Sequence, residues 1–241
     1  IIPMEWLKYF SQFIEDNNPN LICGPVAYNN VNSWLSHFQN FELLSLMNFT
    51  IGAFGNKKPF LCNGANLCYH KTLFDKVNGY TDNNHIASGD DVFLLENALS
   101  IDSTMVHFIK SKEMLVQTNP ENSLKNTIQQ RIRWASKSSH YKNTFGKLIG
   151  ILILLMNGLL VSLIILSIVD FKYIQIFAYA LFIKMVADGL IIARTKSFLQ
   201  DKKLSLFQYT TSSLAYPFFS VYIAIQSVFL PYNWKGRRFN K

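Results

Sequence analysis

The chain has 241 residues and a formal net charge of +8, and 49% of its side chains are hydrophobic whereas 16% are charged. Because soluble domains carry about 25% charged residues, this composition excludes a wholly soluble, a disordered or a collagen-like chain. The three cysteines, Cys23, Cys62 and Cys68, have neither the paired spacing of a zinc site nor the density of a disulfide framework. We therefore expect reduced thiols, and a chain of which part lies in lipid.

Residues 1–145 mix charged and apolar side chains, and turn residues recur among them. In chain order, the pattern predicts helices over 6–17, 34–49, 71–77, 90–100 and 123–140, and strands over 21–28, 60–69, 104–109 and 113–117. Gly52 and Gly55 should follow the second helix in a loop, and Gly79 should end the third helix. Helices that alternate with single strands predict an α/β layer fold for this front domain.

Residues 146–241 form a second region, in which long apolar runs dominate. The run over 148–169 contains no charged residue, and its helical length of roughly 33 Å suffices to cross a bilayer core. The run over 171–193 predicts a second transmembrane helix. A third segment, 207–230, is more polar in its first half and is interrupted by Pro217, so it predicts either a span or a re-entrant segment.

The distribution of charge predicts the orientation of the chain. Basic residues cluster over 137–147 and 194–203, which places the front domain in the cytosol. The basic tail, 235–241, should lie on the same side, which favours a re-entrant or interfacial third segment. Lys184 and Asp188 lie four residues apart in the second apolar run, and we expect them to pair inside the membrane. Positive charge beside apolar runs indicates lipid headgroups as partners, and no nucleic acid.

The first chemical motif is the acidic pair Asp90 and Asp91, which follows Gly89 at the start of a predicted helix. A carboxylate at the positive end of a helix dipole stays ionised and fixed in direction. Such a carboxylate can act as the general base for a hydroxyl group. The alternative is structural, with Asp90 as the cap of the helix and Asp91 in its first turn.

The second motif lies on the last helix before the membrane and consists of Gln130, Arg131, Arg133 and Trp134. Guanidinium groups match phosphate oxygens in a two-pronged geometry, and an indole offers a flat surface for a sugar ring or an acyl chain. The alternative is a helix whose arginine and tryptophan side chains anchor it among lipid headgroups.

The third motif is a turn that interrupts a predicted strand and includes Asn63, Gly64 and Asn66. Its amides can form hydrogen bonds with a polyhydroxyl ligand, and the glycine allows the backbone to approach closely. The alternative is that Asn-Gly is simply a common turn dipeptide.

Taken in order, these three motifs and the turn Val77-Asn78-Gly79-Tyr80 resemble the second half of a membrane-anchored family 2 glycosyltransferase of the GT-A type. The resemblance implies that the acidic pair supplies the catalytic base, which falls on Asp91. It also implies that Gln130, Arg131 and Arg133 face the diphosphate of the donor and that Trp134 positions the acceptor.

One part of the family pattern is missing. Members of this family hold a divalent metal, Mg²⁺ or Mn²⁺, and the nucleotide diphosphate with an Asp-x-Asp motif, and no such motif occurs in this sequence. We therefore expect no metal site in this chain, a metal-binding half upstream of it, and no activity of these residues alone.

The function that follows is inverting transfer of a sugar from a nucleotide-sugar donor to a hydroxyl group of a lipid-linked or cell-envelope acceptor, by an integral membrane enzyme with a cytosolic catalytic domain. The alternatives are a processive polysaccharide synthase and a non-catalytic membrane scaffold or transporter subunit.

Overall fold

The computed structural model describes residues 1–79, 89–138, 140–229, 232–234 and 237–239. The longer helices are α1 (Trp6–Asn17), α2 (Trp34–Gly55), α3 (Lys71–Lys76), α4 (Asp90–Asp102), α5 (Leu124–Ser138), α6 (Thr144–Val169), α7 (Lys172–Phe198) and α8 (Leu206–Phe229). The strands are β1 (Leu21–Cys23), β2 (Val26–Tyr28), β3 (Leu67–Tyr69), β4 (Val106–Phe108), β5 (Val116–Thr118), β6 (Tyr232–Trp234) and β7 (Arg237–Phe239). Tyr80 of the predicted turn lies outside the described residues.

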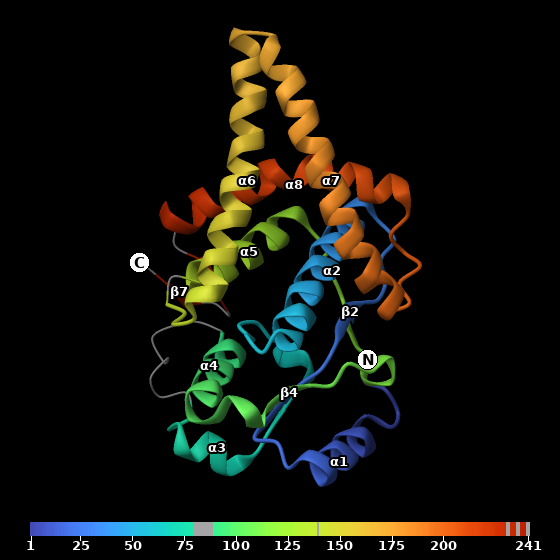
Figure 1. Ribbon diagram of the computed structural model, residues 1–241, viewed down its shortest axis with the longest axis vertical. Coiled ribbons are helices and arrows are strands. Elements are labelled where there is room, and N and C mark those ends of the chain that lie inside the picture. The colour runs from blue at the N-terminus through green and yellow to red at the C-terminus, as the bar shows by residue number, and fades with distance from the viewer. Residues whose placement is uncertain (80–88, 139, 230–231, 235–236, 240–241) are drawn as a thin grey trace.

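The molecule is elongated (Figure 1). Helices α1, α3 and α4 lie at one end, near β4, and the hairpin of α6 and α7 projects from the other end. Helices α2 and α5 lie between these two parts, and α8 runs across α6 and α7 instead of alongside them.

The front domain contains two small sheets. In the first, β1 pairs antiparallel with β3 and parallel with β4, so that Ile22 lies between Cys68 and His107. In the second, β2 and β5 are parallel. Buried side chains of β1 and α4 pack together, among them Leu21 and Leu95. The fold thus combines helices and short strands, as the sequence predicts in coarse outline.

The strand predicted over 21–28 is split into β1 and β2. A Cβ at Gly24 would lie 2.3 Å from the side-chain nitrogen of Asn66, so that amide fills the space beside the glycine. The same nitrogen donates to the carbonyl oxygen of Pro25 at 2.9 Å. Likewise, the strand predicted over 60–69 begins only at β3, because Gly64–Asn66 form a short 3-10 turn.

Helix α2 is longer than predicted and continues to Gly55. Glycine within a helix costs about 1 kcal/mol, and the packing of α2 against α7 and α8 outweighs that cost. Polar contacts reinforce this packing, since the amide of Asn40 donates to Asp201 at 3.0 Å. Residues of the front domain and of the apolar region therefore share one core, which includes Met47 and Ile192.

Helices α6, α7 and α8 are each long and apolar enough to cross a membrane. Helix α8 is continuous through Pro217, which is buried, so the interruption predicted there is wrong. The lost backbone hydrogen bond does not break the helix, because neighbouring helices α2, α5 and α6 pack around it. The outer face of α8 carries an apolar stripe that includes Phe207, Leu214, Phe218 and Ile225.

Candidate active site

The acidic pair opens α4. Gly89 precedes it in the left-handed backbone conformation, at φ = +100°, and Asp90 is exposed at the first helical position. Asp91 is half-buried, and its Oδ2 accepts a hydrogen bond of 2.8 Å from the backbone N–H of Gly64. Its Oδ1 accepts from the N–H of Val92 at 2.9 Å. The carboxylate therefore lies at the positive end of the helix with its direction fixed through both oxygens.

In the glycine turn, Gly64 contacts the acidic pair. The side-chain amides of Asn63 and Asn66 instead form hydrogen bonds within the fold. Asn63 accepts from the N–H of Ala65 at 3.0 Å and so caps the short turn. Asn66 is fully buried, and its amide nitrogen donates to the carbonyl oxygens of Pro25 and Met114. A role for Asn66 in binding ligand stays a prediction. In the structure its amide bonds the segments that precede β2 and β5.

Arg131 lies on the side of α5 that faces α2. Its guanidinium donates to Glu42 Oε2 from Nη2 at 3.0 Å and from Nε at 3.2 Å, and both side chains are buried. Burial raises the pKa of the Glu42 carboxyl, and the charge of Arg131 opposes that shift. The resemblance implies that Arg131 faces a diphosphate, and that role stays a prediction. The structure gives this guanidinium an internal partner, Glu42.

Gln130 and Trp134 adjoin this ion pair. The amide nitrogen of Gln130 donates to Glu121 at 2.9 Å, and its oxygen accepts from Arg131. The guanidinium carbon of Arg131 lies 4.4 Å from the ring centre of Trp134, which is half-buried. The guanidinium of Arg131 therefore covers one face of the Trp134 indole.

The opposite side of α5 turns toward the acidic pair. Arg133 lies two residues from Arg131, which corresponds to about 200° around a helix, and Lys137 follows Arg133 by one turn. Both are buried, and the charge of Lys137 interacts with those of Asp91, Asp90 and Arg133. The structure thus brings together Asp91, Gly64, Arg133 and Lys137, while Arg131 belongs to a separate internal cluster.

Sequence reasoning overlooked Lys137 and Glu96 as parts of this region. Lys137 could have been found from its position one turn after Arg133. Glu96 of α4 accepts hydrogen bonds from the backbone N–H groups of Lys142 and Asn143, at 2.9 and 2.8 Å. It therefore ties the helix of the acidic pair to the start of α6, and only the tertiary fold reveals this contact.

Within the described ranges, no three His, Cys, Asp or Glu side chains gather as ligands for a metal ion would. The acidic pair alone offers two carboxylates, of which Asp91 already accepts two hydrogen bonds from backbone N–H groups. The side chains of the described residues alone therefore do not fit a divalent metal.

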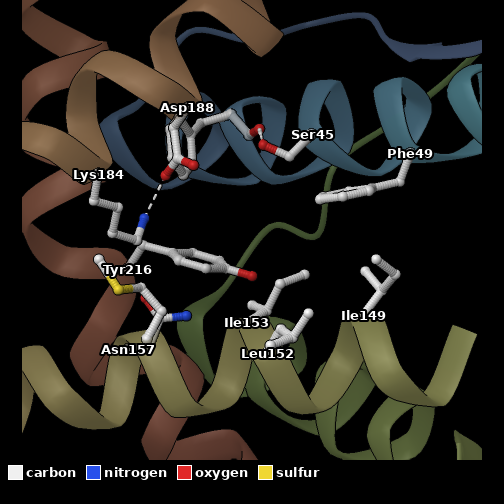
Figure 2. A pocket seen from close by; sticks show the side chains of 11 residues that line it. Ser45, Phe49, Ile149, Leu152, Ile153, Asn157, Lys184, Asp188 and Tyr216 are labelled. Atoms are coloured by element: carbon white, nitrogen blue, oxygen red, sulfur yellow. Dashed lines mark hydrogen bonds and ion pairs between the residues drawn. The ribbon is translucent and has the colours of Figure 1, made fainter.

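A cavity of about 280 Å³ lies between α2, α6, α7 and α8. Figure 2 shows Phe49 and Ile149 facing each other at one end, and the ion pair of Lys184 and Asp188 at the other. The hydroxyl group of Tyr216 points into the space between them. The predicted pairing of Lys184 with Asp188 is therefore present in the structure.

Comparison with known families places most of the chain in one of them. A family model described as "Glycosyl transferase family group 2" matches residues 1–192 of the 241, which covers the front domain, α6 and most of α7. No curated protein matches the chain.

Proposed function

Because the chain belongs to glycosyl transferase family group 2, we propose that it is part of a membrane enzyme in which Asp91 is the general base for sugar transfer. The observation that carries this assignment is the placement of Asp91. Its carboxylate is fixed at the start of α4 by the N–H of Gly64, and its charge interacts with that of the buried Lys137. A base of this kind must be held in one direction, and the two hydrogen bonds from backbone N–H groups support that requirement for Asp91.

The proposed reaction takes a nucleotide-sugar donor and an alcohol acceptor. Asp91 removes the proton of the acceptor hydroxyl as the oxygen attacks the anomeric carbon of the donor. The new glycosidic bond forms on the face opposite the leaving nucleoside diphosphate, so that configuration inverts. Negative charge develops on the diphosphate, and we assign its stabilisation to Arg133, a buried cation of α5 whose charge interacts with that of Lys137.

Trp134 is proposed to position the acceptor, because its indole is half-buried and offers a flat apolar surface beside Arg131. A divalent metal on an Asp-x-Asp motif stays a prediction, since this sequence lacks the motif and the described side chains form no cluster that could hold the ion. We assign no step of the reaction to a metal ion.

The three long apolar helices support a membrane protein. We propose that α6 and α7 cross the bilayer as a hairpin and that α8 lies at the cytosolic interface, with its apolar stripe toward lipid. The crosswise direction of α8 in Figure 1 and the exposure of that stripe support this arrangement. It places the catalytic domain and the basic tail on one side and suits a lipid-linked acceptor.

The test is Asp91→Asn in the full-length protein. Asparagine keeps the size of the side chain and an oxygen acceptor for the N–H of Gly64, but it cannot take a proton at neutral pH. We expect sugar transfer to fall by about 10²-fold or more, with nucleotide binding unchanged. Asp75→Asn, which alters an exposed carboxylate on α3, is the matched control and should retain activity. Substantial turnover by Asp91→Asn would remove the base assignment.

A further inference from the structure

The cavity between α2, α6, α7 and α8 has an apolar end and a polar end (Figure 2). Phe49 and Ile149 face each other at the apolar end. Asn157 and Tyr216 lie near the ion pair at the other end. Because Ile149 and Asn157 belong to the same helix, α6, their separation in sequence corresponds to about 12 Å along its axis. The cavity therefore suits an elongated ligand with an apolar body and one polar group.

Asn157 is fully buried, and one end of its amide lacks a partner. Its Nδ2 donates to Ser220 Oγ of α8 at 3.3 Å, whereas its Oδ1 has no hydrogen-bond partner among the described residues. A buried acceptor without a donor loses the hydrogen bond that water would supply, and this loss destabilises the fold. A ligand that donates a hydrogen bond to Oδ1 would remove that cost.

The charges at the polar end balance each other. Lys184 pairs with Asp188, one turn further along α7, and the lysine side chain is only 9% exposed. An anionic ligand would lie near Asp188 and a cationic ligand near Lys184, and neither would meet an uncompensated opposite charge. Charge complementarity therefore favours an uncharged donor, such as a hydroxyl group.

Water alone does not suit this cavity. Its volume of about 280 Å³ corresponds to about nine water molecules, each of which needs several polar partners, whereas most of the lining residues are apolar. Leu152 lines the cavity and is nevertheless 54% exposed, so this wall of α6 also belongs to the outer surface of the apolar region. A ligand with an apolar body can therefore come from surrounding lipid.

We propose that the cavity binds a neutral lipid with a hydroxyl group, whose chain lies between Phe49 and Ile149 and whose hydroxyl donates to Asn157 Oδ1. The cavity shares no lining residue with the acidic pair, so the inference does not depend on the role of Asp91. Because α2 belongs to the front domain and α6 and α7 to the apolar region, the bound lipid would contact both.

The experiment titrates the full-length protein in detergent with decanol and with decyl methyl ether, and measures affinity from thermal unfolding. The two probes have the same chain, but only the alcohol donates a hydrogen bond. We expect decanol to bind about fivefold more tightly, as one additional hydrogen bond implies. Asn157→Leu should abolish this preference. Ser220→Ala, which leaves the unpaired oxygen of Asn157 in place, is the matched control and should keep it.

A second pair of variants tests whether the probes occupy this cavity. Ile153→Phe places a larger side chain in it and should weaken the binding of both probes about tenfold or more. Leu155→Phe enlarges a side chain that is 64% exposed, two residues further along α6 and so on its opposite side, and should bind like the wild type.

Three results would overturn the proposal. Equal affinity of the wild type for the alcohol and the ether would mean that water satisfies Asn157. Tighter binding of decyl phosphate than of decanol would indicate an anionic lipid instead. Unchanged binding by Ile153→Phe would place the probes elsewhere. Should Asn157→Leu not fold, Asn157→Val takes its place under the same criterion.

Discussion

The ion pair between Arg131 and Glu42 gives the most direct test of how α5 is held. Arg131 Nη2 lies 3.0 Å from Glu42 Oε2, and the two side chains are only 7% and 9% exposed. Arg131→Met would leave the carboxylate of Glu42 buried without its guanidinium. Removal of one partner from a buried pair costs about 3–5 kcal/mol, because the remaining charge is neither paired nor hydrated.

The assay is thermal unfolding of the full-length protein in detergent. For a chain of this size, a loss of that magnitude corresponds to a fall in Tm of roughly 6–20 °C. The double variant Glu42→Met with Arg131→Met removes both charges, so its loss should be smaller than that of either single variant. Lys125→Met, on the exposed side of α5, should leave Tm within about 2 °C of the wild type.

One outcome would contradict a structural role for Arg131. An Arg131→Met protein with the Tm of the wild type but without sugar transfer would show that this guanidinium serves a ligand and not the fold. The expectation that Arg131 faces the donor diphosphate would then replace the structural assignment.

Three further variants test the packing around the acidic pair by thermal unfolding or hydrogen exchange. Asn66→Ala removes the amide that bonds the carbonyls of Pro25 and Met114, and should cost roughly 2–4 kcal/mol. Gly89→Ala must adopt φ = +100° and displace the lysine beside it, so it should cost about 1–3 kcal/mol and lower turnover. Glu96→Gln should speed amide exchange at the start of α6, since a neutral acceptor binds those N–H groups less strongly.

Much of the helical framework could be predicted from local sequence. The apolar spacing that predicts a helix over 6–17 matches α1, and the glycine and acidic pair mark the start of α4. The split between β1 and β2 falls at Gly24-Pro25, where proline has no N–H for a ladder, so local sequence could have indicated it. The contact of Asn66 with this break could not be predicted, because Asn66 lies some forty residues further along the chain. The end of α2 was missed for the same reason, since packing against α7 and α8 decides whether Gly52 stays helical.

The candidate site was predictable as a set of motifs but not as an arrangement. Asp91 and Gly64 belong to different motifs, and only the fold joins them through one hydrogen bond. Arg131 and Arg133 were grouped as one phosphate-binding surface, although a separation of two residues places them on opposite sides of a helix. Attention to helical phase would have separated them and would have added Lys137 to the side of Arg133.

The dependence of stability on pH gives a last test of Lys137. Burial lowers its pKa from 10.5 to about 8, so between these values the unfolded chain binds the proton and the folded chain does not. The free energy of unfolding should therefore rise with pH across this window, by up to about 3 kcal/mol, and the charged lysine should cost stability below pH 8. Lys137→Met lacks this titration, so it should be the more stable protein at pH 7, measured by thermal unfolding. A less stable Lys137→Met would mean that the lysine is there for the fold. A Lys137→Met protein that is more stable but transfers less sugar would mean that the buried lysine serves function at a cost in stability.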